Sequence, residues 1–371
     1  MTQRILYCTD SLMAGGTEHQ LVALISRLNR QQFAPYVICL YGQRAGRSLH
    51  FLEELQKLDV PVTLLDLKWS PWDKLLAVGA LIGTTWRVRP QIVQAVNYHS
   101  NLLLRIARPL MPRSTQVVGC IYVEYTSKQL FYEYLTGWLC SAIVCNSPFL
   151  QKQLPRYLSP QVILNGVDIE RFSRNPDSAL RSRISPQAKY VLLTLGRVAR
   201  QKSPYFLIEA LGVLKKRGQL PPNVAVWIVG EMQDQEVQRQ IDQGIHHYCL
   251  ENVVLQFPPT SVPESYYHAA DIVVLPSLWE GLPNVVLEAL AAGKPLIVSQ
   301  AANTSEVIKE GRNGWVVKTG DVESLAASLH KVLALDVSAM RSDCKASALP
   351  FSMTRMVLDY EMLYERLSAR S

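Results

Sequence analysis

Two carboxylates bracket the start of an apolar helix in the second half of the chain, within Glu280-Gly281-Leu282-Pro283-Asn284-Val285-Val286-Leu287-Glu288. The apolar run at 271–276 before them is typical of a buried parallel strand, and Pro283 suits the first helical position. The helix is apolar almost all round, so we expect Glu288 to be buried and to need a partner. Backbone N–H groups at Asn284 and Val285 open the helix and attract an anion. The segment therefore predicts a pocket for a polar, phosphorylated ligand.

The spacing of the two glutamates indicates separate tasks. Eight residues of helix span about 12 Å, which is too far for two carboxylates to share a proton. We therefore expect Glu280 and Glu288 to contact different parts of one ligand. The alternative for Glu288 is a structural ion pair with a buried arginine.

Two cations follow the apolar run at 190–195, in the segment Gly196-Arg197-Val198-Ala199-Arg200-Gln201-Lys202. Glycine lets the chain turn at the strand end, and Arg197 and Lys202 then offer one fork-shaped and one point-like positive charge. This pair suits a diphosphate, whereas simple surface solvation is the alternative for any Lys or Arg.

Candidate residues in the first half also follow apolar runs. The turn Met13-Ala14-Gly15-Gly16-Thr17-Glu18 lacks the GxGxxG spacing, which weakens a dinucleotide-binding interpretation, and its glycines permit close backbone approach to a ligand. A plain tight turn is the alternative.

His99 follows the run at 92–96 and could bind a sugar hydroxyl or move a proton. The alternative is a histidine whose hydrogen bonds are only to its local neighbours. Tyr122, after the run at 117–121, is a weaker candidate of the same kind.

The composition favours two α/β domains. The chain has 371 residues, of which 48% are apolar and 19% are charged, as in well-packed globular proteins. We find no secretory signal, and the uncharged window at 134–151 contains Asn146-Ser147-Pro148, so it does not resemble a membrane span. The seven cysteines form no CxxC pair and no metal pattern. We expect them to be reduced core residues of a cytoplasmic protein.

The positive charge is uneven. Residues 1–165 carry 16 Lys and Arg against 9 Asp and Glu, and residues 166–371 carry 22 against 22, so the net charge of +7 belongs to the first half. This surplus suits an anionic membrane surface or a polyanionic acceptor, and solubility alone is the alternative. Tryptophan, tyrosine and basic residues gather at 68–89 and 122–138, which fits a membrane interface or ordinary core packing.

Apolar runs alternate with amphipathic segments throughout the chain, which predicts parallel βα units. The expected strands are 5–8, 36–41, 62–65, 92–96, 117–121, 142–146, 190–195, 224–229, 253–257, 272–275, 296–299 and 315–317. A polar stretch from Asn165 to about Lys189 suits a linker between domains. A final helix is expected over 352–366, with Met356, Leu363 and Leu367 on one side. Ligands of such domains bind beyond the carboxyl ends of the strands.

With these residues in place, the chain resembles the GT-B glycosyltransferases of the large retaining family 4 (glycosyl transferases group 1). The resemblance rests on an ordered set of motifs over nearly the whole chain: Gly15-Gly16-Thr17-Glu18, Asn165-Gly166-Val167-Asp168, Gly196-Arg197…Gln201-Lys202 and Glu280-x7-Glu288. It implies an α/β fold of two Rossmann-like doubly wound domains facing a central cleft. These would be an acceptor domain at 1–165 and a nucleotide-sugar donor domain at 166–350, with a helix at 351–371 crossing back to the first domain.

The resemblance also implies site roles. Glu280 would hold the hydroxyls of the donor sugar and Glu288 those of the ribose, and Glu280 and His99 are the candidate catalytic residues. The remaining donor-binding candidates are Gly15, Gly16, Asn165, Arg197, Lys202, Gly230, Gly281, Leu282, Asn284 and Val285. No DxD motif occurs, so we expect Arg197 and Lys202 to replace a metal, with no cofactor beyond the donor.

The expected function is transfer of a sugar, with retention of configuration, from a nucleotide-sugar donor to a glycan or lipid-linked acceptor in surface polysaccharide or glycolipid synthesis. The protein would be cytoplasmic, with a possible peripheral place at the inner membrane face, and would need no nucleic acid. Two alternatives stay open. One is a nucleotide-sugar epimerase or phosphorylase on the same fold, and the other is a non-catalytic glycan- or membrane-binding protein.

Overall fold

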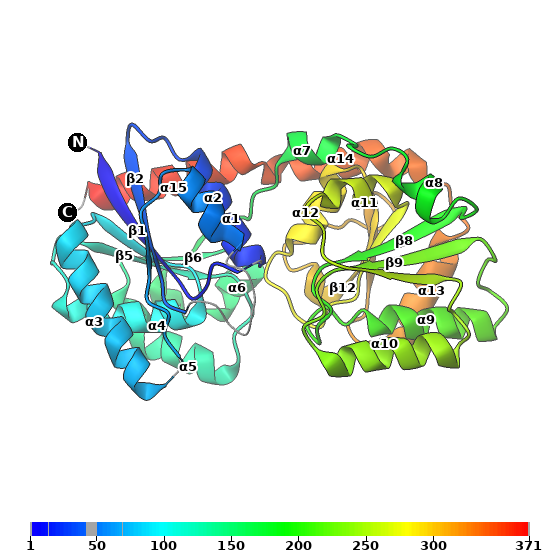
Figure 1. Cartoon of the computed structure of the whole chain (residues 1–371), viewed down its shortest axis with the longest axis horizontal. Coiled ribbons are helices and arrows are strands. Elements are labelled where there is room, and N and C mark those ends of the chain that lie inside the picture. Colours follow the sequence, from blue (N-terminus) through cyan, green and yellow to red (C-terminus); the bar gives the residue numbers. More distant parts are fainter. Residues whose placement is uncertain (1, 14, 42–49, 69, 370–371) are drawn as a thin grey trace. The chain divides into compact units, whose positions relative to one another are not determined.

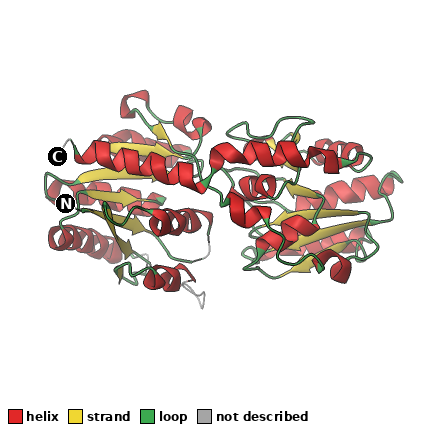
Figure 2. Ribbon diagram, turned by 90° about the horizontal axis from the view of Figure 1, so that it is seen from above, coloured by secondary structure: helices red, strands yellow, loops and turns green. Residues whose placement is uncertain are grey.

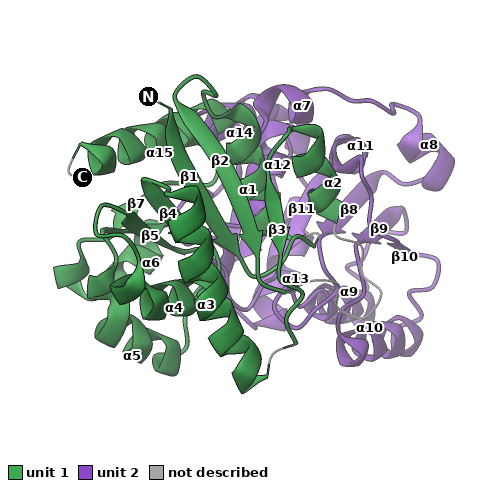
Figure 3. Ribbon diagram, turned by 60° about the vertical axis from the view of Figure 1, so that its left-hand side comes forward, with its two compact units in different colours: residues 1–166, 353–371 green, residues 167–352 purple. Residues whose placement is uncertain are grey.

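The computed structural model describes residues 2–13, 15–41, 50–68 and 70–369, which form two compact units (Figure 3). Unit 1 comprises residues 1–166 and 353–371, and unit 2 comprises residues 167–352. Ala14 of the glycine turn and Trp69 of the first aromatic segment lie outside the described residues. In the part of the chain that is described, no helix has both the length and the apolar character needed to cross a bilayer.

Unit 1 contains a parallel sheet of seven strands in the order β3-β2-β1-β4-β5-β6-β7 (Figure 1). The strands are β1 Gln3–Thr9, β2 Phe33–Cys39, β3 Val62–Leu64, β4 Ile92–Ala95, β5 Gln116–Ile121, β6 Ala142–Cys145 and β7 Gln161–Val162. The six strands predicted for this half are confirmed. The seventh, β7, escaped prediction because two residues give no periodicity. The strand order reverses between β1 and β4, which is the topological switch point of the sheet.

Helices cover both faces of this sheet, as in a doubly wound fold (Figure 2). One face carries α1 Gly16–Arg27, α2 His50–Lys57 and α15 Met353–Ser368. The other face carries α3 Pro71–Val88, α4 Tyr98–Ala107, α5 Ser127–Thr136 and α6 Pro148–Gln153, with short 3-10 turns η1 Arg108–Leu110, η2 Gly137–Leu139 and η3 Arg156–Leu158.

The C-terminal helix α15 is part of the unit 1 core. Met356, Leu363 and Leu367 are buried against α1 and the sheet, so the predicted apolar side of this helix is confirmed. Two buried tyrosines add polar contacts: Tyr364 donates to Gln94 Oε1 at 2.8 Å, and its hydroxyl lies 3.1 Å from that of Tyr7. The end of the chain therefore returns to the first domain, as the GT-B resemblance implied.

Unit 2 contains a parallel sheet of six strands in the order β10-β9-β8-β11-β12-β13. The strands are β8 Tyr190–Leu195, β9 Val224–Val229, β10 Val254–Phe257, β11 Ile272–Leu275, β12 Leu296–Ser299 and β13 Gly314–Val317, all six of which were predicted. The switch point of this sheet lies between β8 and β11.

The helices of unit 2 also lie on both faces of its sheet (Figure 1). One layer is α9 Tyr205–Lys216, α10 Gln235–His247 and α13 Val322–Val332; the other is α11 Pro263–Ala269, α12 Asn284–Ala291 and α14 Arg341–Ala348. The predicted linker at 165–189 instead contains α7 Ile169–Ser173 and α8 Leu180–Ile184, which pack on α12 and α11. Both helices have only five residues, and the polar composition of the segment gives no helical pattern, so neither helix was predicted.

A buried ion pair joins α4 to α5 in unit 1. Arg105 Nη2 lies 2.7 Å from Glu133 Oε2, and both side chains are buried. The same guanidinium donates through Nε to Cys140 Sγ at 3.2 Å. Glycine at position 119 of β5 leaves room for it, since a Cβ there would lie 3.0 Å from Arg105 Nη2.

Breaking this pair from one side should cost more than removing both charges. We expect Arg105→Met to lower the free energy of unfolding by about 3–5 kcal/mol, because Glu133 then stays buried without its cation. Adding Glu133→Leu should recover much of that loss, whereas Arg366→Met, an exposed control on α15, should cost under about 0.5 kcal/mol. Urea unfolding measures all three. An Arg105→Met variant as stable as the control would contradict this account of the pair.

Candidate active site

A nearly buried ion pair lies beyond the carboxyl ends of β8 and β11, at the switch point of unit 2. Lys202 Nζ lies 2.6 Å from Glu280 Oε1. Gln201 fixes the other carboxylate oxygen, donating from Nε2 to Glu280 Oε2 at 3.3 Å and to the carbonyl of Trp279 at 3.1 Å. One loop thus presents a cation and the neighbouring loop presents a carboxylate, and the Gln201 amide orients the carboxylate.

Arg197 extends this cluster toward solvent. Its two Nη groups donate to amide oxygens, one to Gln201 Oε1 at 3.1 Å and one to Gln233 Oε1 at 3.2 Å. Both of these contacts are to neutral groups, so they orient the guanidinium without cancelling its charge. Arg197 and Lys202 are therefore brought to the same strand end, as predicted.

Gly230 has a structural reason to be glycine. A Cβ at this position would lie 1.8 Å from the carbonyl oxygen of Gly196, whose own φ of +134° suits glycine. The two turns that follow β8 and β9 are thus packed backbone against backbone. This contact explains the residue type at Gly230 without a ligand.

Glu288 projects from α12 and finds a hydroxyl partner. Tyr267, buried in α11, donates from Oη to Glu288 Oε2 at 2.8 Å, so the predicted need for a partner is met by a tyrosine rather than by an arginine. Burial raises the pKa of Glu288, and the Tyr267 hydrogen bond and the charges of Arg171 and Lys202 offset part of that shift. The tyrosine thus orients the carboxylate, and no cation of the described residues lies within ion-pair distance of it.

The expectation of eight helical residues between the two glutamates is wrong. Helix α12 begins at Asn284, and Glu280 lies in the loop before it. Pro283 is the N-cap rather than the first helical residue, because its φ of −71° combines with an extended ψ of 126°. A proline side chain cannot accept a hydrogen bond, so the partial positive charge of the helix start is not capped by it.

The predicted backbone segment at the start of α12 is firmly packed. Gly281, Leu282 and Val285 are buried and Asn284 is half-buried. Thr304 donates its hydroxyl to the carbonyl of Gly281, which ties the segment to the loop after β12. The helix start is therefore a rigid group of dipoles next to Lys202 and Glu280.

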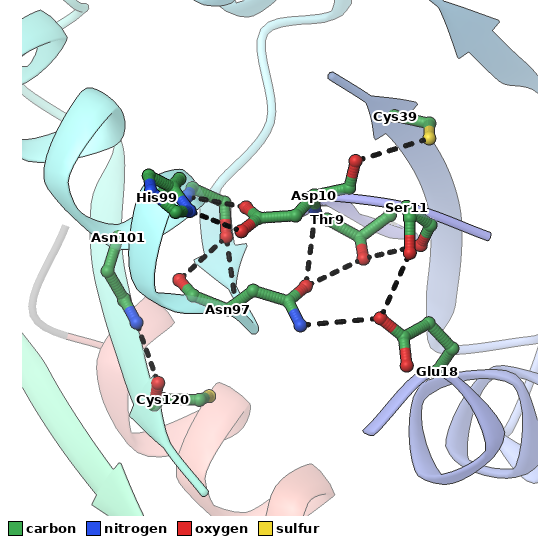
Figure 4. Close-up of polar contacts among 10 residues, drawn as sticks. Thr9, Asp10, Ser11, Glu18, Cys39, Asn97, His99, Asn101 and Cys120 are labelled. Carbon is green, nitrogen blue, oxygen red and sulfur yellow. Dashed lines mark hydrogen bonds and ion pairs between the residues drawn. The ribbon is translucent and has the colours of Figure 1, made fainter. Parts of the chain in front are cut away.

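A second polar cluster occupies the switch point of unit 1, beyond β1 and β4 (Figure 4). Asp10 accepts from the Ser100 backbone N–H at 2.7 Å, and its other oxygen lies 3.1 Å from His99 Nδ1. Asn97 Oδ1 accepts from the Thr9 hydroxyl at 2.9 Å and from the Asp10 backbone at 3.0 Å. A carboxylate at Nδ1 makes that nitrogen the donor and fixes the orientation of the His99 ring.

The two glycines at the start of α1 lie next to a buried carboxylate. Gly15 is the N-cap and Gly16 begins the helix. A Cβ on Gly15 would lie 2.3 Å from Glu18 Oε2, so a larger residue there would displace the Glu18 carboxylate. Glu18 Oε1 accepts from Ser11 Oγ at 3.3 Å and from Asn97 Nδ2 at 3.4 Å. The glycine turn therefore belongs to the same cluster as Asp10 and His99.

Asn165 and Tyr122 belong to two different parts of unit 1. Asn165 lies beyond the ends of β6 and β7, where its Oδ1 accepts from Asn146 Nδ2 at 3.3 Å. The Tyr122 hydroxyl instead contacts that of Tyr360 on α15, so this side chain points toward the core. The weaker candidacy of Tyr122 as a site residue is therefore not supported by its geometry.

Several residues of the two clusters were missed from the sequence: Asp10, Glu18, Asn97, Gln201 and Tyr267. Asp10 and Asn97 stand at the ends of β1 and β4, so a search for every polar residue after a strand could have found them. Tyr267 carries no such signal, because it contacts Glu288 from a different helix. Among the described residues, no group of three or more His, Cys, Asp or Glu side chains is arranged to hold a metal ion.

The buried Glu18 makes stability depend on pH. Burial raises its pKa above the ordinary 4.5, partly offset by hydrogen bonds from Ser11 and Asn97. The native state then keeps a proton that the unfolded chain releases, so stability falls as pH rises from about 4.5 through the raised pKa. We expect Glu18→Gln to reduce this fall, as measured by urea unfolding over a pH series. The exposed control Glu53→Gln should keep the wild-type slope, and an equal slope for Glu18→Gln would contradict the assignment.

Comparison with known families accounts for most of the chain. Residues 14–171 match the model of Glycosyltransferase Family 4, and residues 178–349 match that of Glycosyl transferases group 1. The chain is 31% identical to the UDP-Gal:alpha-D-GlcNAc-diphosphoundecaprenol alpha-1,3-galactosyltransferase of Escherichia coli over 185 residues. The aligned segment covers 47% of this chain and 46% of that protein. It is 24% identical over 172 residues to the capsular polysaccharide biosynthesis glycosyltransferase CapM of Staphylococcus aureus, covering 46% and 43%. The chain spans about half the length of these curated relatives.

Solved structures show the same fold over the full length. Alr3699/HepE of Anabaena in complex with UDP-glucose superposes with a TM-score of 0.83 at 22% identity, covering 98% of this chain and 100% of that one. Sucrose-phosphate synthase of Thermosynechococcus elongatus gives 0.80 at 17% identity, covering all of both chains. The chain therefore belongs to the GT-B glycosyltransferases of family 4, with a Glycosyltransferase Family 4 segment followed by a group 1 segment.

Proposed function

We propose that this enzyme transfers a sugar, with retention of configuration, from a nucleotide-sugar donor to a glycan or lipid-linked acceptor in surface polysaccharide or glycolipid synthesis. The observation that carries the proposal is the Lys202–Glu280 pair beside Arg197 and the start of α12. The named activities of the Escherichia coli and Staphylococcus aureus relatives, and the UDP-glucose bound to HepE, support this class of substrates.

The pair fits the chemistry of a sugar diphosphate. Such a donor has anionic oxygens and neutral hydroxyls in adjacent positions, joined through one anomeric oxygen. Lys202 offers a cation for the phosphate, and Glu280 offers acceptor oxygens for the hydroxyls of the sugar, with 2.6 Å between the two groups. A ligand with a phosphate but no hydroxyls would leave Glu280 without a partner, and a ligand with hydroxyls but no phosphate would leave Lys202 without one.

The same groups would assist departure of the nucleoside diphosphate. Negative charge grows on the leaving phosphate as the sugar–phosphate bond breaks, and fixed cations and dipoles lower the barrier for that step. Arg197, Lys202 and the start of α12 supply this stabilisation from preorganised positions. These cations can take the part that a divalent metal plays in other transferases, so we propose a reaction that needs no metal and no cofactor.

The remaining candidates are assigned to substrate contacts. Glu288, oriented by Tyr267, would hold the ribose hydroxyls, and Gly230 and the buried segment at 281–285 would line the diphosphate side. In unit 1, His99, oriented by Asp10, would bind a substrate hydroxyl. The backbone of Gly15 and Gly16 and the amide of Asn165 would complete that edge. The leaving phosphate would accept the proton of the acceptor hydroxyl.

A lipid-linked acceptor would also define where the enzyme works. Such an acceptor stays in a bilayer, whereas the donor diffuses in water, so transfer takes place at the membrane surface. We propose a cytoplasmic enzyme that is peripheral at the inner membrane face. The seven free cysteines fit a reducing compartment.

Substitution of the pair tests the proposal. A thermal-shift screen of UDP-glucose, UDP-galactose, UDP-N-acetylglucosamine and GDP-mannose would first select the donor. We expect Glu280→Gln and Lys202→Met to lower transfer by about 100-fold or more while the proteins stay folded, because each removes a charge that faces the reacting groups. Lys331→Met, a control in an exposed ion pair with Glu310, should keep wild-type activity. Wild-type turnover in both site variants would refute the proposal.

The stereochemistry gives a separate test of the retaining mechanism. An α-linked donor should yield an α-linked product, which proton NMR coupling at the anomeric carbon can establish during the first turnovers. A β-linked first product would show inversion and would contradict the assignment of the leaving phosphate as proton acceptor.

A further inference from the structure

The outward side of α3 in unit 1 is apolar. Trp72, Leu75 and Leu76 are 77%, 63% and 62% exposed. Trp86, near the other end of the same helix, is also exposed. Gly79 and Gly83 lie on the same side, where an added Cβ would meet no atom within 4 Å. The opposite side of α3, which includes Ala77 and Leu81, packs on the sheet. Helix α3 is therefore apolar both toward the core and toward solvent. An exposed apolar surface of this kind marks a site that contacts another protein or a membrane.

The apolar surface continues on the neighbouring elements. Helices α3, α4 and α5 lie side by side on one face of the sheet, and Trp86 Nε1 donates to the carbonyl of Leu110 in η1 at 3.0 Å (Figures 1 and 3). We name the whole surface the α3–α5 face. Its further exposed apolar side chains are Ile106, Leu110, Phe131, Tyr134, Leu135, Trp138 and Tyr157. Core packing, the alternative for the aromatic residues in the sequence, does not apply to these exposed side chains.

The positive charge of unit 1 comes from the same part of the chain. Residues 68–160 contain ten Lys or Arg against three Asp or Glu, whereas residues 1–67 contain six of each kind. Of the three acids, Glu133 is buried with Arg105, Asp73 caps the start of α3 and Glu124 accepts from Gln153. The surplus of seven positive charges therefore falls within residues 68–160, the part of the chain that forms the α3–α5 face.

The position of the charges on α3 favours a lipid surface. Lys74 and Arg87 are exposed and lie within two residues of Trp72 and Trp86 along the sequence, and α3 has no charged residue between them. Fourteen residues of helix separate the two tryptophans by about 21 Å. Tryptophan and basic residues at both ends of an apolar stripe are typical of helices that lie in the interface of a bilayer. A second copy of this chain would bring like charges together, which opposes self-association through this face.

We propose that the α3–α5 face docks on an anionic phospholipid surface, with α3 lying in the plane of the headgroups. Trp72 and Trp86 anchor the two ends of α3, Leu75 and Leu76 enter the acyl boundary, and Lys74 and Arg87 contact lipid phosphates. The inference deepens the proposed function and rests on it for the lipid-linked acceptor. Docking itself requires neither donor nor turnover, so it can be tested alone.

Vesicle sedimentation of the full chain tests this docking. Wild-type protein should bind phosphatidylcholine vesicles that contain phosphatidylglycerol, bind pure phosphatidylcholine weakly, and be released by salt. Leu75→Ser/Leu76→Ser should weaken binding on the order of tenfold or more through lost apolar contact. Lys74→Glu/Arg87→Glu should weaken it by about fivefold for each basic residue removed. Met362→Ser, 65% exposed on α15 across the sheet, should bind as the wild type does.

Several results would overturn the proposal. These are no binding to anionic vesicles, equal binding to neutral ones, or wild-type binding by both double variants. If the wild type does not bind vesicles but forms a concentration-dependent dimer that Leu75→Ser/Leu76→Ser abolishes, the face would instead be assigned to contact with a second copy of the chain. Glu280→Gln should bind vesicles normally, and both double variants should keep the wild-type thermal shift with the donor. A failure of the catalytic proposal is thereby distinguishable from a failure of membrane docking.

Discussion

The ion pair between Lys202 and Glu280 is the interaction on which the account of the active site depends. Two loops from neighbouring strands of unit 2 meet there, and neither charge is stable so far from water without the other. Gln201 and Arg197 are arranged around the pair, and the start of α12 lies beside it. Binding of a sugar diphosphate would replace this internal compensation with contacts to the ligand, which gives the protein a reason to keep two nearly buried charges together.

Both units place their polar clusters at the point where the strand order reverses. In unit 1 this point lies between β1 and β4, where Asp10 contacts His99 and Asn97 links Asp10 to Glu18. In unit 2 it lies between β8 and β11. Crossovers on opposite faces of a sheet leave an opening at that position, so side chains there have room for a ligand. The same sheet in unit 1 supports a quite different surface on α3, where the outward residues Trp72, Leu75 and Leu76 are apolar and exposed.

The fold was largely predictable because parallel strands give continuous apolar runs. Twelve strands were predicted and all twelve occur, whereas β7 and the short helices α7 and α8 are too brief to leave a pattern. Arg197, Lys202 and Glu280 were found because each follows a strand closely. Tyr267 was not, because its contact with Glu288 depends on how α11 packs on α12. The exposure of Trp72, Trp86 and Trp138 could not be predicted, because composition does not show which aromatic side chains face solvent.

Separate affinities for the whole donor and for its leaving group test the central claim most directly. Isothermal titration would compare the selected nucleotide sugar with the corresponding nucleoside diphosphate, using wild type, Glu280→Gln and Lys202→Met. If Glu280 contacts the sugar and Lys202 the phosphate, Glu280→Gln weakens only the nucleotide sugar, and Lys202→Met weakens both ligands. Equal weakening of both ligands by Glu280→Gln, or unchanged affinities in both variants, would contradict the account.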